Sequence, residues 1–475
     1  MRRVMVVAAA WLLTAGAAMA QTQATAKVEG GVIVGETTER ARVFRNVPYA
    51  APPVGPLRWA PPQRVAKWVG ERDATKNGPS CPQPMNADGT PNAFGGANGP
   101  VSEDCLQLYV FAPKTAKKAP VMVWIHGGGH RVGAGWVYDG QNFARDGVVL
   151  VSINYRLGAF GYLAHPALTK AAGGQPTGNF GLMDQIAALK WVQRNIAAFG
   201  GDPQNVTVFG ESAGGASVLA LLATPGARGL FNGAIVQSGG GWSEGRSLAQ
   251  AEAAGVEALA RAGAPADATA AQLREIPFEK LVPLAGDYGP LQDGRLMTLT
   301  VGQAFARGRA TDVPLMIGWN SGEDTVAFGG LVGPAEQLRS NDDRDRFTDR
   351  VFGAPARWIA AKAAGGKPSY LYHFSYIGSR FRPGMTRAAH AAEIQYVFEY
   401  WGRRTPMSVV SDEDRAMAAR MHGCWVAFAK TQAPCSDWPA YSPESDRLME
   451  FGSPGGVREG FRKAQLDAQD AGAPK

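Results

Sequence analysis

Residues 205–223, NVTVFGESAGGASVLALLA, join a short β-branched run to a run of small and aliphatic residues. The first run predicts a strand and the second a helix. Ser212 lies between them, with Gly210 and Gly214 two residues away on either side. In a strand–serine–helix turn the serine takes a strained backbone conformation, and side chains at the two glycine positions would obstruct it. The segment therefore predicts a nucleophile elbow that presents Ser212 at a helix N-terminus.

A second Gly-x-Ser-x-Gly string, GWSEG, runs from residue 241 to 245. In a chain with 60 glycines the string alone does not identify a nucleophile. Glu244 follows Ser243 directly, so its carboxylate would lie beside the amide that has to receive a developing negative oxygen. We therefore predict Ser212 as the nucleophile and keep Ser243 as the alternative.

An apolar run at residues 121–125 leads into His126 and three glycines. A glycine run allows backbone amides to turn toward a ligand without steric cost. In acyl transfer the former carbonyl oxygen becomes negative in the transition state, and fixed amide donors bind that charge better than the neutral substrate. We predict the amides of Gly128, Gly129 and Ala213 as these donors. A plain glycine turn between two strands is the alternative.

Five further segments resemble the type B carboxylesterase family of α/β-hydrolases, which includes cholinesterases and bacterial p-nitrobenzyl esterases. In chain order they are FRNVPYAAPPVG (44–55), SEDCL (102–106), NYRLG (154–158), GNFGLMDQ (178–185) and AIVQSG (234–239). The resemblance implies an α/β-hydrolase fold, with a large, mostly parallel central sheet flanked by helices. It also implies hydrolysis of small-molecule carboxylic esters through an acyl-enzyme, with a Ser-His-Glu triad and no cofactor. No metal-ligand spacing or dinucleotide-binding fingerprint accompanies these segments.

The family's order of serine, acid and histidine leaves three of the six histidines as candidates for the base. His373 lies in the aromatic alternation of residues 369–376, which predicts a strand and a packed side chain. His422 lies inside a predicted helix at residues 412–430, where a structural role is favoured.

His390 is our predicted base, because it follows the loop-breaking Pro383-Gly384 and such a loop can reach the elbow. The residues after it, AAEIQYVF, resemble the family's His-Gly-x-Glu-Ile-x-Phe-Val-Phe, with Ala391 at the glycine position. An ordinary histidine base predicts that activity falls on acidification through a pKa near 6.5.

The acid is expected after residues 313–320, an apolar run that predicts a buried strand. Residues 321–325, SGEDT, follow at its C-terminal end, where α/β enzymes collect catalytic side chains. The family usually has Asp-Glu-Gly here, and this chain has Gly-Glu-Asp. Glu323 keeps the register of the family's glutamate and is our prediction. Asp324 is the rival, and Asp293 is a more distant one that the resemblance assigns to structure.

The N-terminus reads as a secretory leader over residues 1–20. Two arginines precede an apolar stretch at residues 4–18, and the leader ends in Ala-Met-Ala. The stretch is short for a membrane span, and no cysteine lies near the cleavage site to accept a lipid. We expect export to the periplasm or beyond without a stable membrane anchor, with twin-arginine export as an alternative route.

Residues 21–475 are predicted to form a single catalytic domain, since the predicted triad runs from residue 212 to 390 and has to meet in space. A strand-like run at residues 148–153 and a helical apolar face over residues 182–196 fit an alternating α/β pattern. The polar, glycine-containing end from residue 455 onward is expected to pack weakly.

Four cysteines in an exported chain predict disulfides. Cys81 and Cys105 match the first disulfide loop of the family, which leaves Cys424 and Cys435 as the second pair. Buried free thiols are the alternative reading.

The formal net charge of +7 is scattered along the chain. Its densest short group, Lys114, Lys117 and Lys118, lies between two prolines and predicts a solvated loop instead of a nucleic-acid surface. Phe94 is the one aromatic residue between Cys81 and Cys105, which argues against a cholinesterase-like cation site. A binding or adhesion protein on the same fold is the alternative function, but such relatives have generally lost triad members.

Overall fold

The computed structural model describes residues 23–90, 96–242, 244–328, 338, 340–402 and 405–474. The expected leader at residues 1–20, Phe94 and Ser243 lie outside this described part of the chain. Among the helices that the structure describes, none combines the length and the apolar character that a membrane crossing requires.

The strands belong to one 13-stranded sheet. They are β1 Gln23–Val28, β2 Gly31–Thr37, β3 Arg42–Pro48, β4 Glu71–Asp73, β5 Gln107–Ala112, β6 Ala119–Ile125, β7 Val149–Ile153, β8 Gly201–Glu211, β9 Gly233–Gln237, β10 Leu315–Asn320, β11 Ser369–Phe374, β12 Arg447–Phe451 and β13 Gly456–Glu459. Their order is β1-β2-β3-β5-β7-β6-β8-β9-β10-β11-β12-β13, and β4 pairs with β2. Neighbours from β7 to β12 run parallel, while the first strands and β13 pair antiparallel.

The helices follow the strands in the alternation that the sequence predicts. The α-helices are α1 Gln141–Arg145, α2 Gly158–Tyr162, α3 Pro166–Ala171, α4 Phe180–Asn195, α5 Ala213–Ala223, α6 Leu248–Arg261, α7 Ala270–Arg274, α8 Phe278–Leu281, α9 Val301–Ala306, α10 Thr325–Phe328, α11 Asn341–Thr348, α12 Ala354–Ala363, α13 Ile394–Val397, α14 Asp412–Thr431 and α15 Lys463–Asp467. Short 3-10 turns occur at Gly55–Leu57, Gly135–Val137, Ile196–Phe199, Pro225–Ala227, Met407–Val409 and Asp470–Gly472, and a π-helical turn at Asp349–Gly353.

The central strands are buried on both faces, which is why they read as continuous apolar runs. Along β6, Val123 and Ile125 enter one core cluster while Met122 and Trp124 enter another. Because side chains alternate across a strand, these two clusters lie on opposite faces of the sheet. The first cluster contains apolar side chains of α4, α5 and α12, and the second contains those of α1 and α14.

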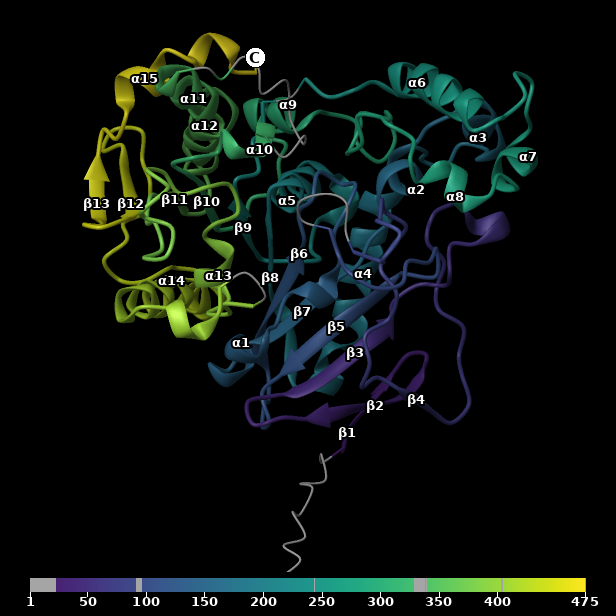
Figure 1. Cartoon of the computed structure of the whole chain (residues 1–475), viewed down its shortest axis with the longest axis horizontal. Coiled ribbons are helices and arrows are strands. Elements are labelled where there is room, and N and C mark those ends of the chain that lie inside the picture. The colour runs from purple at the N-terminus through teal and green to yellow at the C-terminus, as the bar shows by residue number, and fades with distance from the viewer. Residues whose placement is uncertain are drawn as a thin grey trace, which may run out of the picture.

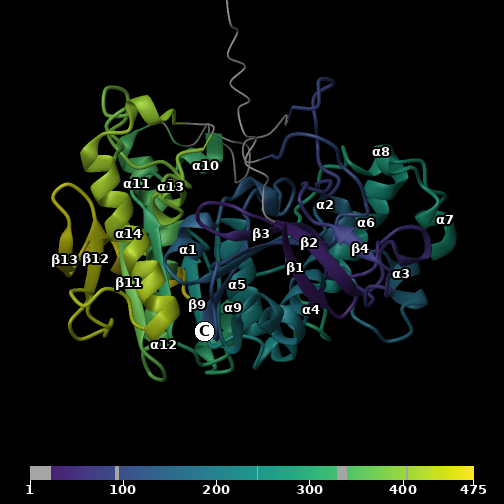
Figure 2. The same ribbon diagram turned by 90° about the horizontal axis from the view of Figure 1, so that it is seen from below.

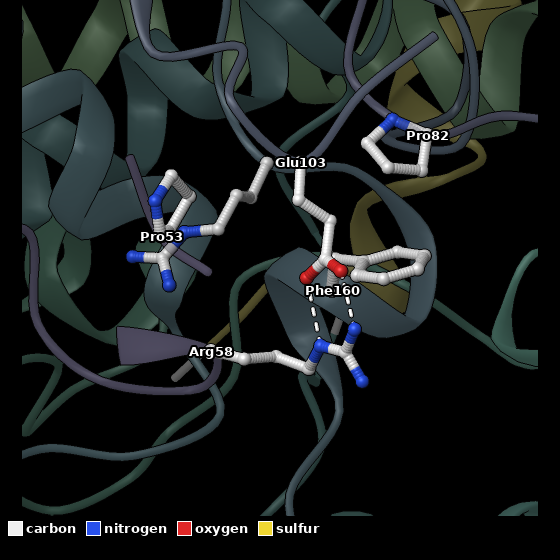
Figure 3. A pocket seen from close by; sticks show the side chains of 6 residues that line it. Pro53, Arg58, Pro82, Glu103 and Phe160 are labelled. Carbon is white, nitrogen blue, oxygen red and sulfur yellow. Dashed lines mark hydrogen bonds and ion pairs between the residues drawn. The ribbon is translucent and has the colours of Figure 1, made fainter. Parts of the chain in front are cut away.

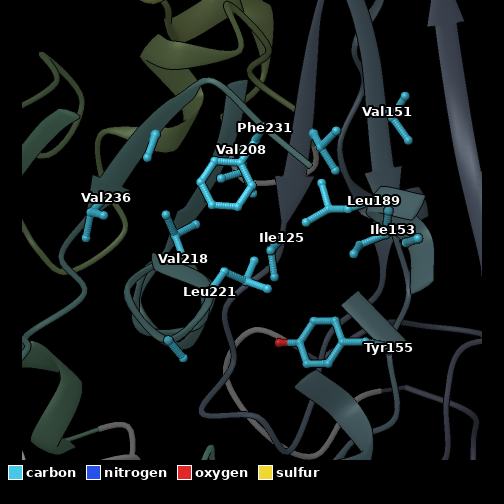
Figure 4. Packing of buried hydrophobic residues seen from close by; sticks show 14 of the residues in the cluster. Ile125, Val151, Ile153, Tyr155, Leu189, Val208, Val218, Leu221, Phe231 and Val236 are labelled. Carbon is cyan, nitrogen blue, oxygen red and sulfur yellow. The ribbon is translucent and has the colours of Figure 1, made fainter. Parts of the chain in front are cut away.

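The core on the α5 face is shown in Figure 4. Val208 of β8 and Val236 of β9 lie near Val218 and Leu221 of α5, and each of these four side chains is fully buried. Complete burial of a Val or Leu side chain stabilises the fold by about 1.5–3 kcal/mol. This packing fixes the helix that begins directly after Ser212.

Two groups of elements lie at opposite sides of the molecule in both views (Figures 1 and 2). β12, β13 and α14 lie on one side, and α3, α6, α7 and α8 lie on the other. The second group packs around its own apolar cluster, which includes Leu163, Leu259 and Leu273.

The C-terminal segment packs more firmly than its sequence predicts. β13 pairs with β12, and Leu466 of α15 is fully buried in the main core. Arg462 forms an ion pair with the buried carboxylate of Asp349, the two nearest atoms being 2.7 Å apart. The expectation of weak packing after residue 455 was wrong at these positions, because one core side chain and one ion pair to a buried carboxylate anchor a segment whose other described side chains are exposed or half-buried.

Both expected disulfides are present. Cys81 is bonded to Cys105 across 24 residues, and Cys424 is bonded to Cys435 across 11. Disulfides of this kind are consistent with an exported protein.

We expect the double change Cys81→Ser and Cys105→Ser to lower the free energy of unfolding by about 3 kcal/mol, because the open loop gains entropy in the unfolded chain. Urea denaturation of the variant and the wild type checks this. An unchanged denaturation midpoint would show that the bond does not constrain the unfolded chain.

Candidate active site

The predicted elbow is formed by the end of β8, Ser212 and the start of α5. Ser212 has φ +57° and ψ −123°, a conformation that an L-residue adopts only under strain. A Cβ at Gly214 would come within 2.0 Å of the carbonyl oxygen of Ile125, and one at Gly210 would come within 2.6 Å of the Gly214 carbonyl carbon. The two glycines are therefore required by close backbone packing, as the sequence predicts.

Backbone hydrogen bonds hold the serine in place. The Ser212 amide donates to the carbonyl of Gln237 at 2.8 Å, and the Ser212 carbonyl accepts from the amide of Ala216 at 2.8 Å. The Ser212 amide is therefore already used in a hydrogen bond. The Ala213 amide is the next one along the chain, at the start of α5.

The glycine loop after β6 lies against the elbow. A Cβ at Gly127 would come within 3.1 Å of Ser212 Cβ, so no side chain separates the loop from the serine. Gly128 and Gly129 have φ of +97° and +62°. Within the described part of the chain, the amides of these two glycines donate to no protein acceptor. The loop thus places Gly127 against Ser212, and the next two amides have no protein acceptor in that part of the chain.

Glu323 and His390 meet although 67 residues separate them. His390 Nδ1 is hydrogen-bonded to Glu323 Oε2. The other carboxylate oxygen of Glu323 accepts from Ser238 Oγ at 2.6 Å and from the amide of Asn320 at 2.6 Å. The histidine's own amide donates to Thr325 Oγ1 at 2.8 Å. The acid and the imidazole are therefore both held from several directions.

The rival acids point elsewhere. The carboxylate of Asp324 faces two guanidinium groups, at 3.7 Å from Arg387 and 3.8 Å from Arg344. Asp293 accepts the amides of Leu296 and Met297 at 2.9 Å and 2.8 Å, so it closes a turn. Neither carboxylate contacts His390.

The two other candidate histidines have structural contacts. His373 on β11 lies with its ring centroid 4.6 Å from that of Phe461. His422 on α14 has Nδ1 2.7 Å from the carbonyl oxygen of Val397 and Nε2 3.0 Å from a carboxylate oxygen of Asp146. The structure thus joins Glu323 to His390 and the glycine loop to Ser212, and Glu211, next to Ser212, contacts His390. The alternative residues lie outside this group.

Comparisons with known proteins agree with this geometry. The model of the carboxylesterase family matches residues 17–346 and 335–469. The chain belongs to the carboxylesterase family. It is 36% identical to a fumonisin B1 esterase of Sphingopyxis macrogoltabida, over 93% of this chain and 87% of that protein. It is 34% identical to the para-nitrobenzyl esterase of Bacillus subtilis (strain 168), over 88% of this chain and 93% of that protein.

A solved structure of a PNB esterase superposes with a TM-score of 0.83 at 32% identity, covering 94% of this chain and 99% of that one. A carboxylesterase of Geobacillus stearothermophilus gives a TM-score of 0.80 at 33% identity, covering 94% and 99% of the respective chains. The protein is thus a carboxylic ester hydrolase with the α/β-hydrolase fold that the sequence predicts.

Glu211, the residue before Ser212, was not predicted to lie at the active site of this carboxylesterase. Its side chain is buried, and its Oε1 lies 3.1 Å from His390 Nε2. The described residues contain no hydrogen bond between Ser212 Oγ and His390. In this resting arrangement the imidazole therefore contacts a glutamate through each of its two nitrogens.

The charges around the imidazole change its titration. Burial alone would lower the pKa of His390, but the negative charges of Glu211, Glu323 and Glu393 outweigh it and raise the pKa to about 9. The expectation of a pKa near 6.5 was wrong, because it assumed an imidazole in ordinary surroundings. The three carboxylates thus favour the protonated form of the imidazole.

Glu393 is the second unforeseen carboxylate. It accepts from Gln237 Nε2 at 2.9 Å and from Asn320 Nδ2 at 2.6 Å, and burial raises its pKa. The signal for it was its place three residues after His390, in the segment that resembles the family motif. In the same segment Ala391 has φ +65°, a left-handed conformation that favours glycine and that accounts for the family's usual residue there.

Other segments that carry the family resemblance have structural roles. Arg156 and Asp184, from the NYRLG and GNFGLMDQ segments, form a buried ion pair at 2.7 Å. Glu103 of the SEDCL segment accepts from Arg58 Nε at 2.7 Å, and Figure 3 shows this pair lining a pocket together with Phe160. Such buried pairs fix the loops that carry them.

Proposed function

We propose that the protein hydrolyses carboxylic esters through an acyl-enzyme on Ser212, with His390 as the base and Glu323 as the acid of the triad. The observation that carries the proposal is the contact between Glu323 and His390, at the end of β10, beside a strained serine that lies against the glycine loop. A triad acid has to hold one imidazole in one tautomer, and the two additional hydrogen bonds to Glu323 support that role.

The reaction follows from these groups and water. Neutral His390 turns from Glu211 toward Ser212 and takes its Oγ proton as the oxygen attacks the ester carbonyl carbon. The resulting negative oxygen accepts hydrogen bonds from the amides of Gly128, Gly129 and Ala213. The protonated imidazole returns the proton to the departing alkoxide, which leaves as an alcohol. Water then attacks the acyl-enzyme by the same route and releases the carboxylic acid and free Ser212.

The proposal extends to the whole chain. Residues 1–20 would act as the secretory leader, and residues 21–475 would form a single catalytic domain in the periplasm or outside the cell. The two disulfides support export, since such bonds persist in oxidising compartments. Small-molecule esters are the proposed substrates.

Covalent labelling tests the nucleophile directly. Diethyl 4-nitrophenyl phosphate should react once per chain, because Ser212 Oγ attacks phosphorus and 4-nitrophenolate leaves. Mass spectrometry of a protease digest should place the diethylphosphoryl group on the peptide that contains Ser212. A label on another side chain, or catalysis that continues after full labelling, would contradict the proposal.

The pH profile tests the base. Only neutral His390 accepts the serine proton, and its pKa in the free enzyme is raised to about 9, so kcat/KM for a neutral ester should rise with pH well above 6.5. Glu211→Gln removes the largest charge that raises this pKa, so the midpoint of the acid limb should move to lower pH. Identical midpoints in the variant and the wild type would show that Glu211 does not act on the base.

A further inference from the structure

A cavity of about 350 Å³ opens beside the first turns of α5. Ala216, Leu219 and Ala220 form its apolar wall. The amide of Ala216 donates to the Ser212 carbonyl, so this wall begins one helical turn, about 6 Å, beyond the nucleophile. Residues four apart lie on the same side of a helix, so Ala216 lies on the Ser212 side of α5. Gly239, which follows the serine that donates to Glu323, also lines the cavity.

The lining of the cavity also contains charged residues. Three charged side chains line the cavity, and they are Glu244, Arg246 and Asp287. The side chain of Arg246 is 22% exposed, whereas that of Asp287 is 82% exposed and Glu244 is also exposed. Water screens the two exposed carboxylates, so the half-buried guanidinium is the charge that a bound group would meet without water between them.

The guanidinium of Arg246 makes only long contacts with the protein, so a bound anion could form shorter hydrogen bonds with it. Its Nε lies 3.3 Å from Asp287 Oδ2, and its Nη2 donates to the carbonyl of Gly289 at 3.4 Å. Both distances exceed those of a charge-assisted hydrogen bond, which is about 2.7–2.9 Å. A planar carboxylate matches the fork of a guanidinium and can accept two such bonds.

Further positive charge surrounds the same place. Burial raises the pKa of Tyr288, next to Asp287, while the charges of Arg131, Arg261 and Arg246 act in the opposite direction. Three guanidinium groups thus act on one side chain at the rim of the loop that supplies Asp287 and Gly289. These guanidinium groups favour a bound anion, and the two exposed acids oppose it.

We propose that Arg246 selects esters whose acyl chain ends in a carboxylate. The cavity lies on the helix that carries the acyl group, and among the described residues none of its lining comes from the His390 loop, where the alcohol leaves. The apolar wall of α5 takes the methylene groups of the chain, and Arg246 binds the terminal carboxylate. This inference rests on the proposed function and adds the substrate class to it.

Two esters of equal chain length test this selection. The ratio of kcat/KM for mono-4-nitrophenyl adipate to that for 4-nitrophenyl hexanoate should fall by about 10-fold to 100-fold in Arg246→Gln, because one charged hydrogen-bonding partner is lost. Arg246→Lys keeps the charge without the fork and should lower the ratio less. Arg307→Gln is the matched control. It removes the same charge from an exposed position after α9, and should change the ratio by less than about twofold.

The outcomes separate this inference from the proposed function. Hydrolysis of neither ester by the wild type would contradict the proposed function. If the hexanoate is hydrolysed but the adipate-to-hexanoate ratio of kcat/KM is the same in the wild type and in Arg246→Gln, selection by Arg246 is overturned and the proposed function stands. The same conclusion follows if Arg307→Gln lowers this ratio as much as Arg246→Gln does. If Arg246→Gln does not fold, product inhibition of the wild type decides. Adipate should then inhibit hexanoate hydrolysis more strongly than free hexanoate does, and the reverse order would overturn the inference.

Discussion

Ser212→Ala is expected to lower kcat for 4-nitrophenyl hexanoate by at least about 10⁴-fold. The variant keeps the glycine loop and its amides, but no oxygen remains to form the acyl-enzyme. The small residual rate would come from binding and from amides that stabilise attack by water. Steady-state release of 4-nitrophenol measures the loss, and a thermal melt confirms that the variant is folded.

Ser243→Ala is the control for this prediction. Ser243 stands in the second Gly-x-Ser-x-Gly string of the chain, so it tests whether the string or its strand–turn–helix setting makes a nucleophile. We expect nearly full activity in this variant. A comparable loss at Ser243, or a mild one at Ser212, would show that the elbow assignment is wrong.

The elbow and the glycine loop could be predicted because each has a local cause. The spacing of Gly210 and Gly214 follows from the approach of Ile125, and that approach follows from two adjacent parallel strands. A short motif that one steric constraint determines can be predicted from the sequence without knowledge of the fold. The strand at β6 and the helix at α14 were foreseen for a similar reason, since a sustained apolar or helical pattern dominates each.

The combined effect of the carboxylates on His390 could not be predicted, because it depends on contacts across the sheet. Glu211 ends β8, Glu323 follows β10, and Glu393 stands in the loop before α13. Nothing in the local sequence around Glu211 or Glu393 indicates that its charge acts on His390. Only the parallel arrangement of β8, β9 and β10 brings their side chains to one edge, where three negative charges act on one imidazole. The pKa of His390 therefore depends on the order and direction of these strands.

Glu323→Gln is expected to lower kcat by on the order of 10³-fold or more. The glutamine keeps the shape of the side chain, but it removes the charge that stabilises the imidazolium formed when Ser212 loses its proton. It also presents an amide where His390 Nδ1 now meets a carboxylate oxygen, so the tautomer that the mechanism needs is no longer fixed. Because Ser238 Oγ and the Asn320 amide both donate to Glu323 Oε1, the loop should keep its position.

Asp324→Asn is the matched control, one residue along the same loop. Its carboxylate faces Arg387 and Arg344 at 3.7 Å and 3.8 Å, so its loss should lower the thermal midpoint modestly and change kcat by less than about tenfold. The acid limb of the pH profile separates the two roles further, since only the neighbour of His390 should shift it strongly. A large loss of kcat in Asp324→Asn beside a mild loss in Glu323→Gln would transfer the acid's role to Asp324. It would also require the loop at residues 321–325 to move toward His390 during the reaction, because an aspartate is one methylene shorter than a glutamate.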